Sequence, residues 1–170
     1  MKNIKLNKLS DKNIEGYNMD AREFIKFCVN KSKIFDNKEN EFETNCYSIS
    51  KDEELNFNKQ EKNLKIDYFY MNLPKDAIEF LDVFKGLFVG CDTKIYNKNE
   101  LPIVFVNCFS LESYGLNEII DRIKKAMNFE EFSEKNILSV HNIKDVSPKK
   151  YMYCVSFKIP WEVAFNKNDN

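Results

Sequence analysis

The clearest hydrophobic pattern in the chain lies between residues 101 and 127. Ile103–Phe109 is an almost unbroken run of apolar, β-branched and aromatic residues, which is typical of a strand covered on both faces. From Gly115 onward the apolar residues change to a helical spacing, which places five of them on one side: Leu116, Ile119, Ile120, Ile123 and Met127. We therefore predict a central strand followed by a helix, Gly115–Met127, that packs this side onto the sheet.

The rest of the chain gives weaker patterns of the same two kinds. One helix is expected to begin after a capping Asp20 and to run to about Ile34, and another to run from Pro74 to near Gly90. Further strands are predicted at Phe42–Ile49, Leu64–Tyr70, Cys91–Tyr96, Ile137–Val146 and Tyr151–Ile159. The order of helix, strand and strand occurs three times, so the predicted fold class is α+β, a mainly antiparallel sheet with helices packed on one face.

These elements divide the chain into three segments. Residues 1–73 are predicted to be an N-terminal extension made of an arm, a helix and a strand pair. Residues 74–165 are predicted to form the core domain, in the order helix, two strands, helix, two strands. Residues 166–170 are expected to be a disordered tail. A total of 170 residues suits one medium domain with a core of its own.

Composition excludes some partners. Charged residues make up 31% of the chain, but the formal net charge is only −1, so no chain-wide field attracts nucleic acid or acidic lipid. No apolar run is long enough to span a membrane, and the N-terminus lacks the apolar region of a signal peptide. We therefore expect no membrane partner and a cytoplasmic protein. Five widely spaced cysteines are expected to be reduced: Cys28, Cys46, Cys91, Cys108 and Cys154.

Residues with recognisable chemistry are few. The glycines form no phosphate-binding loop, and the single histidine, His141, leaves a cysteine–histidine pair with Cys91 or Cys108 as the one familiar catalytic option. His141 lies in an alternating strand and Cys108 in the most apolar run, so ordinary structural roles are favoured. We predict no catalytic, cofactor-binding or metal-ligating residue, and no cofactor.

Two charged patterns have simple explanations. The acidic runs Asp52–Glu54 and Glu130–Glu131 fall in polar connections and are expected to be solvated. Lysines adjoin tyrosines around residues 149–153, but no RNA-binding signature is present. We therefore predict no specific nucleic-acid binding.

One resemblance suggests a function. The segments KDAIEFLDVFKGLF, CDTKIYNKNELPIVFVNCF, YGLNEIIDRIKKAM and ILSVHNIKDVSPKKYMYCVSFKIPWEV, from about Pro74 to Val163, resemble in the order of their elements the tail terminator (tail completion) proteins of tailed phages and phage tail-like particles. This resemblance implies a structural protein that is not an enzyme. Its subunits would form a homo-oligomeric ring of six, which caps a tail tube and stops its growth, with tube and sheath-like proteins as partners. It implies a cytoplasmic protein during assembly that becomes part of the particle.

Two alternatives remain open from the sequence. One is a small cytoplasmic binding or regulatory module, such as an inhibitor or a toxin-neutralising partner. The other is a cysteine-dependent enzyme that uses His141. The mass in solution distinguishes the ring from the binding module, because a hexamer favours the ring and a monomer or dimer favours the module. Turnover lost on His141→Ala would indicate the enzyme.

Overall fold

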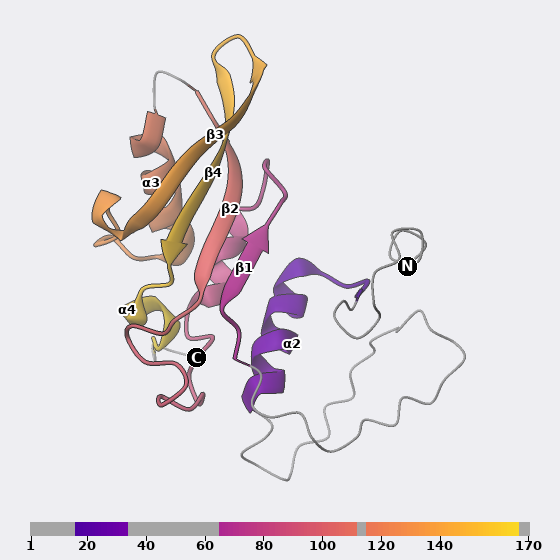
Figure 1. Cartoon of the computed structure of the whole chain (residues 1–170), viewed down its shortest axis with the longest axis vertical. Helices are drawn as coiled ribbons and strands as arrows, with labels where there is room; N and C mark the ends of the chain where they lie inside the picture. The colour runs from indigo at the N-terminus through magenta and orange to yellow at the C-terminus, as the bar shows by residue number, and fades with distance from the viewer. Residues whose placement is uncertain (1–15, 34–64, 112–114, 167–170) are drawn as a thin grey trace.

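A four-stranded mixed sheet is the centre of the fold. The structure, a computed structural model, describes residues 16–33, 65–111 and 115–166. The strands are β1 (Tyr68–Met71), β2 (Ile103–Ser110), β3 (Ile137–Ser147) and β4 (Lys150–Lys158). Their order across the sheet is β1-β2-β4-β3, with β1 and β2 parallel and the other two pairs antiparallel (Figure 1). The predicted α+β class and the central position of the 103–109 strand are therefore confirmed.

Helices cover one face of this sheet. The helices of the described residues are α2 (Ala21–Lys33), the 3₁₀ helix η2 (Glu79–Phe84), α3 (Gly115–Met127), the 3₁₀ helix η3 (Glu134–Asn136) and α4 (Trp161–Ala164). Figure 1 shows α3 and the turns around η2 on the same side of the sheet, with α2 beside the edge strand β1. The helix predicted over Gly115–Met127 has these exact bounds.

The core lies between β2 and the helices. Val104, Val106 and Cys108 alternate along β2 and are completely buried, as the face-by-face alternation of a strand requires. Ile119 and Ile123 of α3 are 1% and 0% exposed. The guanidinium of Arg122 on the same helix donates hydrogen bonds to the Phe109 carbonyl (2.9 Å) and to the Glu79 carboxylate (3.0 Å), which fixes α3 to both the strand and η2.

The segment from Pro74 to Gly90 is helical only in part. Its predicted apolar side is largely in the core, where Ala77, Leu81 and Phe84 are buried, but the backbone forms turns and the short η2 instead of a regular α-helix. The 3₁₀ helix ends before Gly86, whose φ of +66° lies outside the helical region. Its N–H bonds the Val163 carbonyl at 2.8 Å, so the chain turns toward α4.

The strand predicted at Cys91–Tyr96 is wrong, because this segment forms turns. The Asp92 side chain accepts the Lys94 N–H at 2.8 Å, and its carbonyl accepts the N–H groups of Ile95 and Tyr96, which is a local turn that competes with strand pairing. Tyr96 is nevertheless buried, and its hydroxyl accepts the Ile66 N–H at 2.9 Å. The predicted strand is therefore replaced by a turn that still places Tyr96 in the core.

Several predicted features fall outside the described residues. These are the Phe42–Ile49 strand, Cys46, the acidic run Asp52–Glu54, most of the arm and most of the tail. The division into an extension, a core domain and a tail stays a prediction. Across the segments that the structure describes, none of the helices has the length and apolar character needed to cross a membrane.

Candidate functional site

A cluster of polar side chains lies at the carboxyl end of β1. The Asn107 side chain on β2 donates from Nδ2 to the Tyr70 hydroxyl at 3.1 Å and to Oδ1 of Asn72 at 2.8 Å. Asn107 is only 2% exposed. Its Oδ1 is the one buried side-chain oxygen or nitrogen without a hydrogen-bond partner in the part of the chain described here. Because such an atom costs stability, the cluster is a candidate site.

Strand geometry brings these residues together. Tyr70 and Phe69 point to opposite faces of β1, and Phe69 packs against Phe84 of the η2 region with ring centroids 5.1 Å apart. Tyr70 therefore lies on the sheet face opposite η2. Phe105 and Asn107 of β2 lie on the same face as Tyr70, because Tyr70 pairs with Phe105 in the register. Pro74 follows the strand, and its carbonyl accepts the Phe109 N–H at 3.2 Å, which holds the turn against β2.

The hydrogen bonds leave two donors on the outside of the cluster. Because the Tyr70 oxygen accepts from Asn107, its own O–H remains able to donate. Because Oδ1 of Asn72 also accepts from Asn107, the two hydrogens on Nδ2 of Asn72 remain, and no described residue accepts them. Tyr70 is 64% exposed, and Asn72 is exposed as well. The buried Asn107 thus holds two residues that each keep an accessible donor group.

Tyr70 and Asn72 are among the residues that line a pocket of about 430 Å³, a volume within the range of small-ligand sites. The pocket lies between α2 and the β1 edge. Most of its lining is apolar or aromatic, as in Phe24, Ile25 and Phe69. An apolar, aromatic wall with a few oriented polar groups suits a flat heterocycle better than a highly charged ligand.

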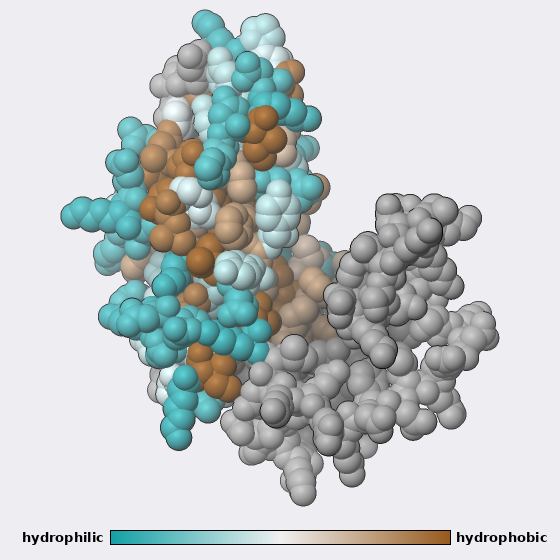
Figure 2. Space-filling view, viewed as in Figure 1, coloured by the Kyte–Doolittle hydropathy of each residue, from teal (hydrophilic) through white to brown (hydrophobic). Residues whose placement is uncertain are grey.

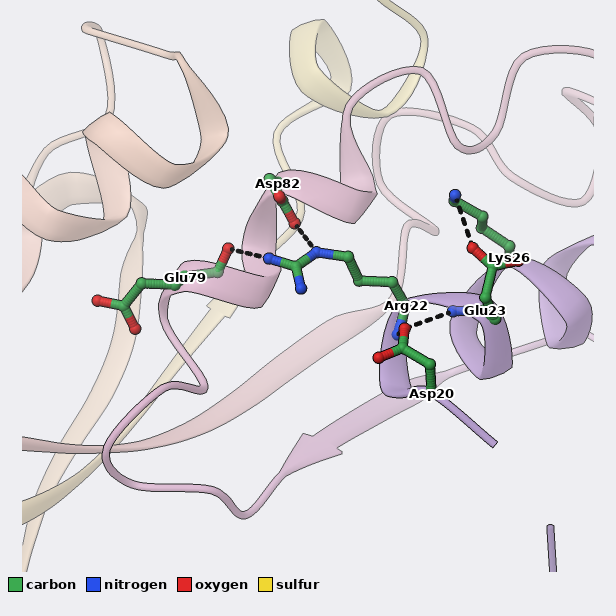
Figure 3. A network of polar contacts seen from close by, with 6 residues as sticks. All are labelled: Asp20, Arg22, Glu23, Lys26, Glu79 and Asp82. Carbon is green, nitrogen blue, oxygen red and sulfur yellow. Dashed lines mark hydrogen bonds and ion pairs between the residues drawn. The ribbon is translucent and has the colours of Figure 1, made fainter. Parts of the chain in front are cut away.

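The wall formed by α2 is held in place by its first turn. Asp20 caps the helix by accepting the N–H groups of Arg22 (2.9 Å) and Glu23 (3.3 Å), as the sequence predicts. Arg22 then extends toward η2, where Nε contacts Asp82 at 2.8 Å and Nη2 donates to the Glu79 carbonyl at 3.2 Å (Figure 3). These contacts fix α2 relative to the turns that follow β1.

The residues considered for catalysis from the sequence do not meet. Cys108 is buried on the helix-facing side of β2, where burial raises the pKa of its thiol to about 12. His141 lies opposite Cys154 in the β3–β4 register, on the face that also carries Asn107. Cys108 and His141 are therefore on opposite faces of the sheet. Cys91 lies in the turns that follow η2, outside the strands.

Acidic residues form no site among the described residues. Glu130 and Glu131 are exposed in the connection after α3. No three His, Cys, Asp or Glu side chains are grouped to hold a metal ion in the described ranges 16–33, 65–111 and 115–166.

Sequence reasoning did not select Tyr70, Asn72 or Asn107. One signal was available, because Asn107 is a lone amide inside the otherwise buried run IVFVNCF, and a buried amide requires partners. The partners themselves lie 35 and 37 residues away in the chain. Only the parallel pairing of β1 with β2 brings them to Asn107.

Comparison with known proteins identifies relatives of one kind. The chain is 35% identical over 191 aligned residues to a tRNA (guanine(37)-N(1))-methyltransferase of Candida albicans, a match that covers 98% of this chain and 41% of the relative. A protein of the same name from Batrachochytrium dendrobatidis is 32% identical over 97% of this chain and 36% of its own length. One from Aspergillus fumigatus is 41% identical over 59% of this chain and 24% of its own length. No protein-family model matches the chain.

The chain spans less than half the length of these curated relatives. Among solved structures, a crystal structure of wild-type Trm5b from Pyrococcus abyssi is similar to 59% of this chain and 27% of that chain, with 23% identity and a TM-score of 0.40.

These relatives overturn the tail-terminator interpretation. The chain is similar to enzymes that modify RNA, so the predictions of a non-enzymatic phage tail protein, a capping ring and tube or sheath partners are wrong. The predicted place in a phage particle is wrong for the same reason, as is the exclusion of nucleic acid. The alternative of a small inhibitory module is not supported either. The error arose because an order of helices and strands is shared by unrelated proteins.

Proposed function

We propose that the chain is part of a tRNA (guanine(37)-N(1))-methyltransferase and supplies the site that holds the target guanine. The observation that carries this proposal is the match of 97–98% of the chain to proteins of that name at 32–35% identity. We place the guanine at the polar cluster at the carboxyl end of β1, because Tyr70 and Asn72 keep accessible donors there and line the pocket.

The two accessible donors fit guanine. Guanine presents O6 and N7 as acceptors on one edge, and the Asn72 amide and the Tyr70 hydroxyl can each donate to an acceptor. A base that leaves its stack can also pack on an aromatic ring, and Tyr68 and Tyr70 are 65% and 64% exposed beside the pocket. In this proposal Asn107 does not touch the base but positions Asn72 and Tyr70.

The same donors would assist the reaction. Methylation at N1 of guanine forms an N1–C bond and breaks the bond between the methyl carbon and the methyl donor, which leaves with the electron pair of that bond. The N1 proton passes to water, and negative charge moves toward O6 as that proton leaves. A hydrogen bond donated to O6 is stronger to the charged form than to the neutral base, so it lowers the barrier. The methyl group itself comes from a methyl donor bound during the reaction.

A chimera tests the proposal. In the Candida albicans relative, the segment matched by this chain is replaced by the chain itself, and N1-methylation of a tRNA transcript carrying guanine at position 37 is measured. We expect the chimera to methylate this transcript and to leave one with adenine at position 37 unmodified. A folded chimera without activity, paired with an active parent enzyme, would contradict the proposal.

Variants of the chimera test the site. Asn72→Ala should lower kcat/KM about 10²-fold, which is typical of losing one donor to a developing negative charge. Asn117→Ala is the matched control, because Asn117 is exposed on α3, and its kcat/KM should remain within about twofold. Equal kcat/KM values for the two variants would show that Asn72 does not take part in the site.

A further inference from the structure

The two faces of the sheet differ sharply in charge. The four strands contain one acidic residue, Asp145, and it pairs with Tyr151 on the helix-facing side. The basic residues of the strands lie on the other side: His141 pairs with Cys154, Lys144 with Met152, and Lys158 with Ile103. Lys150 joins them, since its Nζ lies 4.6 Å from the centre of the Phe109 ring on that face. A chain with a net charge of −1 thus has one sheet face whose strands contribute only positive charge.

Aromatic rings accompany these cations. Tyr68, Tyr70, Phe105 and Phe109 occupy the same face, and the Phe105 ring lies 6.1 Å from Tyr68 and 6.4 Å from Tyr70 between ring centres. Within the described residues neither Lys144 nor Lys150 forms an ion pair. Cations that are not neutralised by carboxylates, together with exposed rings, are the combination with which proteins bind phosphates and unstacked bases.

The β3–β4 hairpin extends this face. It projects beyond the rest of the sheet at the top of the molecule (Figure 1), and its surface there mixes hydrophilic and hydrophobic side chains (Figure 2). Exposed apolar residues accompany the lysines, with Ile143 45% and Val146 43% exposed. Lys149 at its turn has a φ of +61°, which is uncommon for lysine. Lys144 and Lys149 are both exposed. The hairpin therefore presents lysines where a large ligand can reach them.

The geometry points to an RNA-binding surface on this face, on which Lys144 and Lys150 of the hairpin contact phosphates of the tRNA whose guanine enters the pocket. This inference rests on the proposed function. Asn107, Cys154 and His141 lie in one row across β2, β4 and β3, so His141 is about 10 Å from Asn107 by the spacing of adjacent strands. One RNA strand can therefore reach both the candidate site and the hairpin.

Salt-dependent binding of a tRNA transcript to the full chain tests this surface. Lys144→Gln/Lys150→Gln removes two charges, and Lys124→Gln/Lys125→Gln removes two from α3 as the matched control. We expect the hairpin variant to bind roughly tenfold more weakly and to lower the slope of log K against log salt by about 2, one for each phosphate contact. The α3 variant should match the wild-type chain. Circular dichroism of each variant shows that it is folded.

Two other outcomes would overturn the hairpin surface. If the wild-type chain binds the transcript and the two variants lose affinity equally, or not at all, the hairpin surface is overturned while the proposed function stands. If the wild-type chain does not bind the transcript, the surface is also overturned, and methylation by the chimera decides the proposed function separately. Amide exchange locates the contact, and a hairpin that stays unprotected by tRNA but becomes protected by the remaining part of the Candida albicans relative would assign this face to protein.

Discussion

At the scale of a single residue, Asn107 lowers the stability of the fold while it holds two residues of the candidate site. Its buried Oδ1 has no partner among the described residues, and an unsatisfied buried oxygen costs about 1–3 kcal/mol. Its Nδ2 holds Asn72 and Tyr70, which are both exposed and able to bond water instead. A residue selected for stability alone would be apolar at this position.

We therefore expect Asn107→Leu to leave the free energy of unfolding within about 1 kcal/mol of wild type or to raise it, since an apolar group of similar size removes the unsatisfied atom. The same substitution should lower methylation by the chimera. Urea denaturation of the full chain measures the first effect. A loss of more than about 2 kcal/mol would mean that the Asn107 hydrogen bonds serve the fold itself.

Cys108 gives a pH-dependent prediction. Burial raises the pKa of its thiol from 9.0 to about 12, so above pH 9 the unfolded chain loses this proton while the folded chain keeps it. The stability from this thiol is complete below pH 9 and falls as pH rises from 9 toward 12. When the pH is raised from 8 to 10, the free energy of unfolding should fall less for Cys108→Ala than for wild type, by up to about 1.4 kcal/mol. Identical losses, measured by urea denaturation, would show that burial does not shift this thiol.

At the scale of elements, local pattern predicted α3 and β2 well because each has one dominant signal. The helix has a single apolar side, and the strand has an unbroken apolar run. Pro74–Gly90 also has periodic apolar residues, but its backbone forms turns and a 3₁₀ helix that ends before Gly86, whose φ is positive. At Cys91–Tyr96 the side chain and the carbonyl of Asp92 accept local N–H groups and form a turn. In Pro74–Gly90 the apolar spacing therefore predicted which side chains are buried, such as Ala77, Leu81 and Phe84, but not the type of helix.

The packing of α3 can be measured directly. Ile123 is fully buried against the sheet and η2, so Ile123→Ala should cost about 2–4 kcal/mol through lost contacts and a cavity. Asn117→Ala on the exposed side should change the free energy of unfolding by less than about 0.5 kcal/mol. If the urea midpoints of the two variants coincide, α3 does not contribute to the core as described.

At the scale of the whole molecule, the sequence predicted an α+β sheet covered by helices on one face but not its function. The order of elements is compatible with many proteins, and the candidate site depends on the parallel pairing of β1 with β2, which joins residues 35 and 37 positions apart. The charge difference between the faces was hidden too, because the net charge of −1 averages over both. Alternation along β3 could not reveal it, since the register is shifted at Asn142/Lys144.

The central claim is that this chain takes part in methylation of guanine 37 of tRNA. The most direct measurement is the amount of N1-methylguanosine at position 37 in tRNA from the cells that produce the chain, with and without depletion of the chain. We predict that the modification falls on depletion, returns with the wild-type chain and does not return with Asn72→Ala. An unchanged amount of N1-methylguanosine after complete depletion would contradict the account.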